Sequence, residues 1–291
     1  MNNPDGLKAF EQPLASLPPT LRQLILERIQ NLTHYEPVIG IMGKSGAGKS
    51  SLCNELFRGD ASPVSDVNAC TRDVLRFRLR SGCHSLVIVD LPGVGENGQR
   101  DQEYRALYRR MLPELDLVLW VIKADDRALS VDEQFWLGVM QPYQQQVLFV
   151  LNQADKIEPC HEWDTLTSKP SPRQQGNLKA KQAAIMAMFI PCHPVCVVSA
   201  STGWGIEEMV ANMMRCLPDR ATSPVATQLH GRLCTEPVKS QARNDFGEAV
   251  GRVFETAESS SLLPAPLKTV IRTVRDAVLS VARIVWDWIF F

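Results

Sequence analysis

The chain has 291 residues, of which 45% are hydrophobic and 22% are charged, as in an ordinary soluble globular protein. Its 31 Lys and Arg residues nearly balance its 32 Asp and Glu residues, giving a net charge of −1. This balance carries no electrostatic signature of nucleic-acid or anionic-membrane binding, so we expect no DNA partner. The first residues lack a signal peptide, and no uncharged stretch approaches the roughly 18 residues of a membrane span. With eight cysteines in no regular framework, a cytoplasmic protein is expected.

The first predicted element is an amphipathic helix over residues 17–33. Its apolar residues recur at helical spacing after two prolines, at Leu21, Leu24, Ile25, Ile29 and Leu32. We expect this helical arm, residues 1–35, to pack on the domain that follows; an interaction arm is the alternative.

A phosphate-binding loop of the form G-x-x-x-x-G-K-[ST] follows a short apolar strand at residues 38–42 and precedes a helix. It consists of Gly43, Lys44, Ser45, Gly46, Ala47, Gly48, Lys49 and Ser50, with Ser51 next in the chain. The glycines let backbone N–H groups turn toward phosphate oxygens, and the helix N-terminus adds its positive end. Lys49 is expected at the β and γ phosphates, and the Ser50 hydroxyl at Mg²⁺.

The next two strands are predicted to form a hairpin around residues 81–83. In residues 74–80, three arginines alternate with apolar residues, which indicates a half-buried strand. We interpret Arg76, Arg78 and Arg80 as charged residues that protect an exposed edge strand, with an RNA-contacting row as the alternative.

The second strand of this hairpin, residues 86–89, ends in Asp90-Leu91-Pro92-Gly93. An aspartate at the end of a buried strand, about 40 residues after the lysine, lies beside the phosphate-binding loop in this class of NTPase. We predict that Asp90 holds Mg²⁺ through a water molecule and that the Gly93 N–H senses the γ-phosphate.

Two later strands end in groups suited to guanine. Residues 147–151 lead into Asn152-Gln153-Ala154-Asp155, and residues 195–198 lead into Ser199-Ala200-Ser201. Guanine offers two adjacent donors that a carboxylate accepts together, whereas adenine would leave Asp155 unpaired. The predicted base-binding residues are Asn152, Gln153, Asp155, Lys156, Ser199 and Ala200. An ATPase would require a different role for Asp155.

Together these motifs resemble the translation-factor-related GTPases, most closely the Era/TrmE-like branch and its prophage-type "50S ribosome-binding GTPase" members. The resemblance covers residues 36–217. It implies an α/β fold, a three-layer P-loop NTPase (Ras-like G domain) whose mostly parallel sheet has one antiparallel edge strand, and the cofactors GTP/GDP and Mg²⁺. It also implies that Thr71 is the conditional Mg²⁺ ligand, so that Lys49, Thr71 and Gly93 form the catalytic set.

The resemblance further predicts slow hydrolysis, about 10⁻⁴–10⁻² s⁻¹ as in unassisted GTPases. Val94 stands where Ras-like enzymes have the glutamine that orients water. Some relatives instead use a K⁺ ion held by an asparagine, and the matching residue here is Gly46. Arg72 as an arginine finger in cis is a minor alternative. We therefore expect a partner-activated switch.

Helices are expected near 100–111, 131–141, 174–190 and 205–216, between strands near 116–122, 147–151 and 195–198. Alternation of strands and helices predicts helices on both faces of the sheet. Residues 156–173 have the composition of an inserted loop. Cys160-His161 and the segment from Cys192 to Cys196 do not have the usual zinc spacing, so core or loop cysteines are the favoured interpretation.

A C-terminal extension is predicted for residues 218–291. Residues 219–248 look weakly structured, whereas residues 266–291 form an amphipathic helix with basic residues and a terminal aromatic cluster. Packing on the protein or on a second copy is favoured over a membrane surface and over a truncated hairpin anchor. No basic G-x-x-G loop of a KH domain follows residue 218. The open partners are therefore a homodimer, the ribosome or RNA, and a membrane surface. The alternative function is GTP-dependent self-assembly or membrane association, as in septin- and dynamin-like proteins.

Overall fold

The structure, a computed structural model, describes residues 4–58, 61–63, 74–93, 98–258 and 265–291. In this part of the chain, one seven-stranded sheet has the order β2-β3-β4-β1-β5-β6-β7. The strands are β1 (Val38–Met42), β2 (Ala61–Pro63), β3 (Leu75–Ser81), β4 (His84–Asp90), β5 (Leu117–Lys123), β6 (Val147–Asn152) and β7 (Cys196–Val197). The predicted α/β fold is therefore confirmed.

The central strands are parallel, and their continuous apolar runs explain their position. Strands β4, β1, β5, β6 and β7 pair in parallel, and almost every residue of β5 and β6 is buried. A parallel sheet covered on both faces requires such runs. The predicted hairpin joins β3 to β4 through Gly82, at φ +62°. The short β2 pairs antiparallel outside β3 and extends the sheet by one strand.

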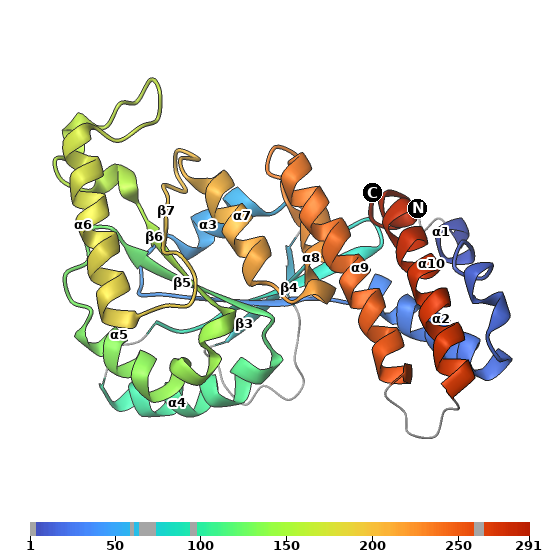
Figure 1. Ribbon diagram of the computed structural model, residues 1–291. Coiled ribbons are helices and arrows are strands. Elements are labelled where there is room, and N and C mark those ends of the chain that lie inside the picture. Colours follow the sequence, from blue (N-terminus) through green and yellow to red (C-terminus); the bar gives the residue numbers. More distant parts are fainter. Residues whose placement is uncertain (1–3, 59–60, 64–73, 94–97, 259–264) are drawn as a thin grey trace.

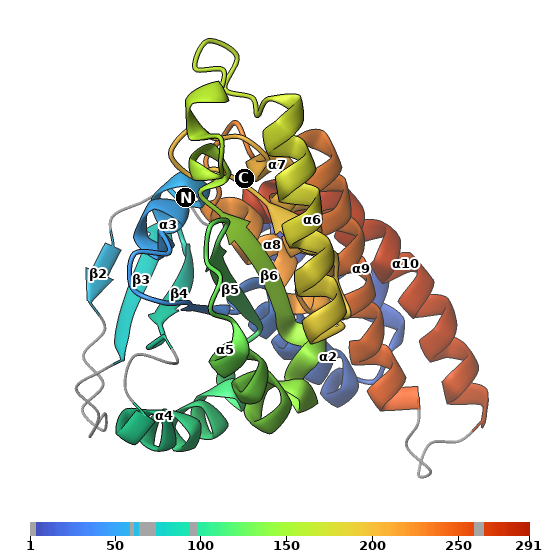
Figure 2. The ribbon, with the colours of Figure 1, turned by 90° about the vertical axis from the view of Figure 1, so that its left-hand side faces the viewer.

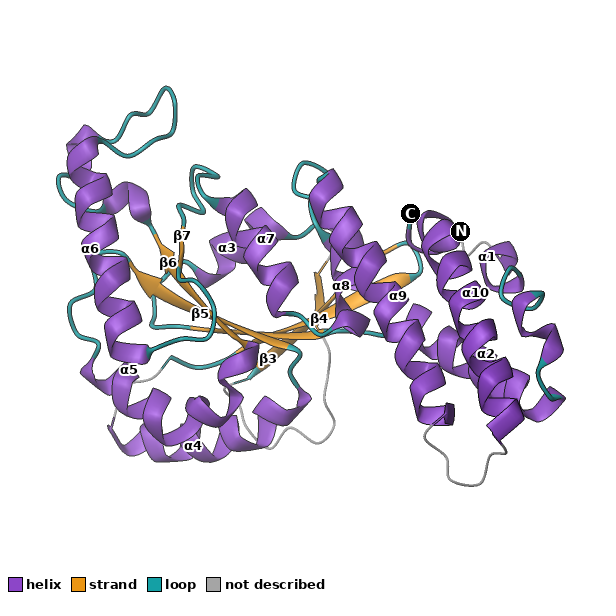
Figure 3. Ribbon diagram, in the orientation of Figure 1, coloured by secondary structure: helices purple, strands orange, loops and turns teal. Residues whose placement is uncertain are grey.

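Helices cover both faces of the sheet (Figures 1 and 3). One face packs against α4 (Gly98–Met111), α5 (Ser130–Phe135) and α6 (Pro172–Phe189). The other face lies in one core with α3 (Lys49–Leu56), α7 (Ile206–Cys216) and α8 (Asp219–Gln228). The same core continues into α2 (Pro19–Thr33), α9 (Glu236–Glu258) and α10 (Ala265–Phe290), which pack mainly on other helices. The short α1 (Pro4–Lys8) contacts α10. None of the described helices combines the length and apolar character that crossing a membrane requires.

The helices from the two ends of the chain pack together and share one core with the sheet: α10 lies alongside α9 (Figure 2), and α2 contacts α9. The predicted helix over residues 17–33 is confirmed as α2, with Ile25 and Ile29 buried. Asp116, which precedes β5, accepts hydrogen bonds from the Tyr35 hydroxyl at 2.8 Å and from Arg220 at 3.2 Å. Burial and the Asp116 carboxylate raise the pKa of Tyr35. This partly buried contact joins the N-terminal arm to α8.

The expectation that residues 219–248 are weakly structured is wrong. They form α8 and most of α9, and Thr222, Ser223, Thr227 and Gln228 are buried. Several of their polar atoms form hydrogen bonds across the core: Ser223 Oγ donates to the Ala242 carbonyl at 3.0 Å, and Gln228 Nε2 donates to the His84 carbonyl at 3.1 Å. Gln228 Oε1 has no partner among the described residues. Polar residues that resemble a loop are thus part of a packed interface.

The arginines of β3 do not all project freely into water. Arg76 forms an ion pair with Glu114 at 2.9 Å, and Arg78 forms one with Glu36 at 2.6 Å. Because these guanidinium groups are bound within the chain, an RNA-contacting row is disfavoured. Arg80 is exposed.

Candidate nucleotide site

The loop between β1 and α3 has the backbone geometry that only glycine accepts readily. Gly46 has φ +72° and Gly48 has φ +86°, in the region where a side chain costs roughly 1–2 kcal/mol. A Cβ atom at Gly48 would lie 2.5 Å from Asn152 Nδ2, and one at Gly43 would lie 2.2 Å from the Val121 carbonyl oxygen. The loop therefore fits closely between the ends of β5 and β6. Its N–H groups precede α3, where a helix N-terminus favours an anion.

Lys49 and Asp90 meet at the edge where β1 and β4 end. Lys49 Nζ donates to the Gly43 carbonyl at 2.9 Å and lies 4.0 Å from Asp90 Oδ1. Asp90 Oδ1 is buried and has no hydrogen-bond partner among the residues that the structure describes. Burial raises the pKa of Asp90, and the Lys49 charge opposes this shift. A buried carboxylate oxygen without a donor fits a bound Mg²⁺ or its water, since Mg²⁺ prefers oxygen ligands.

Ser50 is exposed in the first turn of α3. Together with Lys49 and Asp90 it lines a cavity of about 250 Å³, which extends under β3 to Cys53 and Phe77. Ser51 is also exposed. The predicted contacts of Ser45, Ser50 and Ser51 with nucleotide or Mg²⁺ therefore remain predictions. Thr71, Arg72 and Val94 lie outside the described residues.

Gly93 approaches the phosphate-binding loop too closely for any side chain. A Cβ atom there would lie 2.7 Å from the Gly43 carbonyl oxygen and 2.9 Å from the Lys44 Cα atom. The preceding Pro92 carbonyl accepts a hydrogen bond from the Tyr108 hydroxyl at 2.8 Å. The backbone at Gly93 is thus held against the loop, where the resemblance places a γ-phosphate sensor.

Asn152 joins the phosphate-binding loop to the segment after β7. Its Nδ2 donates to the Ala47 carbonyl at 2.9 Å, and its Oδ1 accepts from the Ala200 N–H at 3.1 Å. Asn152 is 1% exposed, so losing either bond would leave a buried polar group unpaired. The structure brings these three predicted residues together, with Asn152 linking the two loops.

Asp155 is oriented by Ser199, the first residue of the other predicted guanine motif. Ser199 Oγ donates to Asp155 Oδ1 at 2.7 Å, and Ser199 is fully buried. Gln153 stands in the lysine position of the motif at φ +64°, and its Nε2 donates to the Gly46 carbonyl at 2.8 Å. Lys156 is exposed beside them. The two motifs, distant in sequence, therefore form one structural unit.

Lys44 forms ion pairs with two acidic residues that belong to none of the sequence motifs. Its ammonium group lies 2.9 Å from Asp126 and 3.0 Å from Asp132, after β5 and in α5. Burial opposes the charge on Lys44, but hydrogen bonds to both carboxylates outweigh this and raise its pKa. Burial raises the pKa of Asp132. The Lys44 side chain thus connects the phosphate-binding loop to α5 through these ion pairs. The Lys44 backbone N–H remains part of the predicted phosphate-binding segment.

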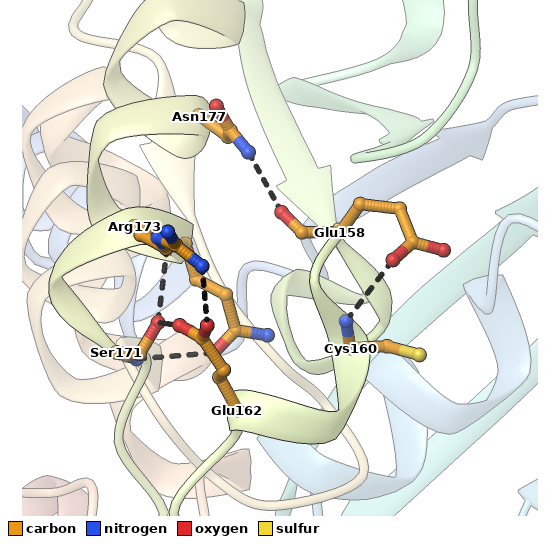
Figure 4. Close-up of polar contacts among 7 residues, drawn as sticks. Glu158, Cys160, Glu162, Ser171, Arg173 and Asn177 are labelled. Carbon is orange, nitrogen blue, oxygen red and sulfur yellow. Dashed lines mark hydrogen bonds and ion pairs between the residues drawn. The ribbon is translucent and has the colours of Figure 1, made fainter.

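The segment after Lys156 is pinned to the start of α6 (Figure 4). Glu162 accepts hydrogen bonds from the Ser171 hydroxyl at 2.8 Å and from Arg173 at 3.1 Å. Asn177 donates to the Glu158 carbonyl at 2.7 Å. Ser171 and Gln174 form a capping box at the helix N-terminus. The predicted inserted loop is therefore fastened at its base, next to Asp155.

Near the site, Cys53 is partly buried and Cys196 is buried. Burial raises the pKa of the Cys53 thiol in α3 and of the Cys196 thiol in β7 to about 12 each. Because thiolate is the form that binds metal or attacks, neither group is primed for such chemistry at neutral pH. Cys196 lies in the buried strand, as predicted.

Comparison with known proteins agrees with the motifs. Residues 38–153 match the family described as 50S ribosome-binding GTPase. The chain is 54% identical to the uncharacterized protein YkfA and 52% identical to the uncharacterized protein YfjP, both of Escherichia coli K12, and covers all of each. It is 30% identical to tRNA modification GTPase MnmE of Beijerinckia indica over 74% of this chain and 47% of that one.

A solved structure of Era in complex with MgGDPNP and 16S ribosomal RNA nucleotides is similar at a TM-score of 0.47 and 17% identity. The similarity covers 82% of this chain and 98% of that one. The predicted resemblance to the Era/TrmE-like GTPases is confirmed at the level of the P-loop GTPase family. The chain thus belongs to the family that includes YkfA and YfjP, a family of P-loop GTPases.

Proposed function

We propose that this GTPase is a slow, Mg²⁺-dependent switch that needs a partner for rapid hydrolysis. The observation that carries the proposal is the shared edge formed by Lys49 and Asp90 at one end and Asp155 at the other. In this assignment Lys49, Ser50, Thr71 and Asp90 hold the phosphates and Mg²⁺. Asp155 reads the guanine N1–H and 2-amino group, while Asn152 holds the two loops in register.

Mg²⁺ would neutralise charge on the β and γ phosphates, and the chain's own groups would position them. Lys49 is held ready by the Gly43 carbonyl, and Gly93 is held against the loop by its close backbone packing. The sequence offers Val94 where a glutamine would orient water and Gly46 where an asparagine would hold K⁺. Hydrolysis by the purified chain is therefore expected to be slow and equally slow in K⁺ and Na⁺.

Calorimetry with GTP, GDP and ATP, followed by single-turnover hydrolysis, tests this function. We expect Mg²⁺-dependent binding of both guanine nucleotides, no ATP binding, and rates of about 10⁻⁴–10⁻² s⁻¹. Rates above about 1 s⁻¹ would mean that one chain carries the complete machinery. Preferential ATP binding would contradict the guanine assignment itself.

A second candidate function is self-association through α10, favoured by an apolar stripe on its exposed side. Ile284, Trp288 and Phe291 are 69%, 58% and 52% exposed, and Val270 is 38% exposed. From Ala277 through Val281 to Ile284, Trp288 and Phe291 the spacing alternates between four and three, as two packed helices require, and Val270 lies one heptad before Ala277. The prediction that the apolar face of α10 packs inward holds for Ile271, Val278 and Val285. Val281 of the second stripe also packs partly against the core, whereas Ile284 and Trp288 are largely exposed.

The charges around the stripe favour a second copy over a membrane. The residues that flank it on its polar side are Thr273, Ser280 and Asp287, none of them basic. Arg283 turns toward Glu248 on α9 instead, at 3.8 Å. These three positions therefore offer an anionic surface no positive charge, and the small side chains of Thr273 and Ser280 suit close approach of another helix. A path from the nucleotide site to α10 is available through α8. The N–H of Arg58, which follows α3, donates to the Gln228 carbonyl at the end of α8 at 2.8 Å.

We expect Ile284→Glu and Trp288→Glu to convert a GTP-dependent dimer to a monomer in sedimentation velocity, because each places a charge in the apolar seam. Leu166→Glu is the matched control, since Leu166 is 95% exposed on a distant loop. A wild-type chain that stays monomeric with GTP and with GDP would overturn this candidate. Flotation of the wild type with lipid vesicles, lost in both α10 variants, would assign the stripe to lipid instead.

A further inference from the structure

Lys123 ends β5 beside the phosphate-binding loop, at a place that no motif assigns. In the sheet register it lies opposite Asn152 of β6. A Cβ atom at Gly46 would lie 3.3 Å from Lys123 Nζ and 3.6 Å from Lys123 Cε. The ammonium group therefore covers the face of Gly46 from which a side chain would project. This side chain is partly exposed, so a ligand on the loop can reach it.

The positive charge of Lys123 is uncompensated within the described chain. Its ammonium group has no hydrogen-bond or ion-pair partner among the residues that the structure describes, whereas other lysines near the loop do. Lys44 binds Asp126 and Asp132, and Lys49 binds the Gly43 carbonyl. The Asp126 side chain is thus already engaged by Lys44, while its carbonyl accepts from Lys181. A partly buried cation without a partner, next to an anion-binding loop, is suited to an anionic ligand.

Two groups that usually support this loop are replaced in the sequence. Gln153 occupies the lysine position after β6, and its neutral amide binds the Gly46 carbonyl. Gly46 itself has no side chain to hold a monovalent cation. Lys123 reaches the same residue from the neighbouring strand and restores a positive charge there. Lys123 is the last residue of β5, whose backbone is paired with β1 on one side and β6 on the other, so its Cα position is fixed by the sheet.

We propose that the Lys123 ammonium binds the polyphosphate of the guanine nucleotide at Gly46 and serves as this chain's built-in cation. The inference rests on the GTP binding proposed above. A fixed cation at the loop would counter the negative charge of the β-phosphate and would not need to be recruited from solution. It also gives a reason why the chain can lack both the lysine of the guanine motif and the asparagine that holds K⁺.

Calorimetry on Lys123→Met tests the proposal, because methionine keeps the apolar stem and removes only the charge. We expect the Kd for GDP and GTP to rise about 10- to 100-fold, as for loss of one charge-assisted hydrogen bond. Affinity for guanosine, which has no phosphate, is expected to stay unchanged. Lys123→Arg should recover most of the affinity. The melting temperature without nucleotide should not change, since the ammonium has no partner within the described chain.

Lys181→Met is the matched control, because it removes a nearby positive charge that already has a partner; its Kd for GDP should match the wild type. An unchanged GDP affinity in Lys123→Met, with a wild type that binds, would overturn the role of Lys123 alone. Equal weakening for guanosine and GDP would also overturn it, since the contact would then lie outside the phosphates. A wild type that binds no guanine nucleotide would instead remove the proposed function.

Discussion

Replacing Asp155 by asparagine is expected to exchange guanine for xanthine as the preferred base. The carboxylate accepts from both guanine N1–H and the 2-amino group, whereas an asparagine accepts from xanthine N1–H and donates to its O2. With guanine, the 2-amino group of the base would face the amide N–H₂ of asparagine. One hydrogen bond is then lost, and two donors face each other. We expect GTP affinity to fall by up to about 10⁴-fold, because a site built to bind a polar group discriminates strongly when it is left unpaired. Competition calorimetry with GTP and XTP measures the exchange.

The contact between Ser199 and Asp155 allows a further prediction about how the asparagine amide is oriented. The Ser199 hydroxyl donates to Asp155 Oδ1 at 2.7 Å. In Asp155→Asn the same hydroxyl favours the orientation in which the amide oxygen takes the Oδ1 position and the amide N–H₂ takes the Oδ2 position. Ser199→Ala in the Asp155→Asn background should therefore reduce the gain for XTP. A variant that binds GTP as well as the wild type would show that Asp155 does not contact the base.

The site could be predicted to this extent because its residues follow strands whose ends meet. Parallel strands bring their carboxyl ends to one edge, so motifs after β1, β4, β6 and β7 converge whatever their distance in sequence. Asn152 and Ala200 are 48 residues apart and hydrogen-bonded. Each motif also specifies its own local geometry, as the positive φ of Gly46 and Gly48 shows.

Contacts without a local signal could not be predicted. The burial of α8 depends on distant groups such as Trp286, whose Nε1 donates to Ser223 Oγ at 2.8 Å, and its own composition resembles a loop. Lys123 belongs to no motif, and only the pairing of β5 with β6 places it at Gly46. The periodicity of residues 266–291 correctly predicted a helix, but could not show which part of its wide apolar face would be buried.

Gly48→Ala should nearly abolish nucleotide binding. A Cβ atom at this position would lie 2.5 Å from Asn152 Nδ2, in a backbone conformation of φ +86°. The Asn152 amide would have to move, and its bonds to the Ala47 carbonyl and the Ala200 N–H would be lost together. Left-handed strain of roughly 1–2 kcal/mol and loss of buried hydrogen bonds at about 1–3 kcal/mol predict a Kd for GDP that rises about 10²- to 10³-fold.

Gly46→Ala separates the two causes, because it introduces the same strain in the same loop. There the new methyl group, at φ +72°, would meet only the end of the Lys123 side chain at 3.3 Å, and this flexible group can shift. Because shifting Lys123 would also disturb its proposed phosphate contact, both glycine variants are compared in the Lys123→Met background. There we expect Gly46→Ala to cost about tenfold, the part due to strain. Equal losses in the two variants would mean that strain alone governs binding and that Asn152 does not hold the loop. A larger loss in Gly48→Ala, with guanine selectivity weakened as well, would place Asn152 as the residue through which phosphate binding and base recognition are joined.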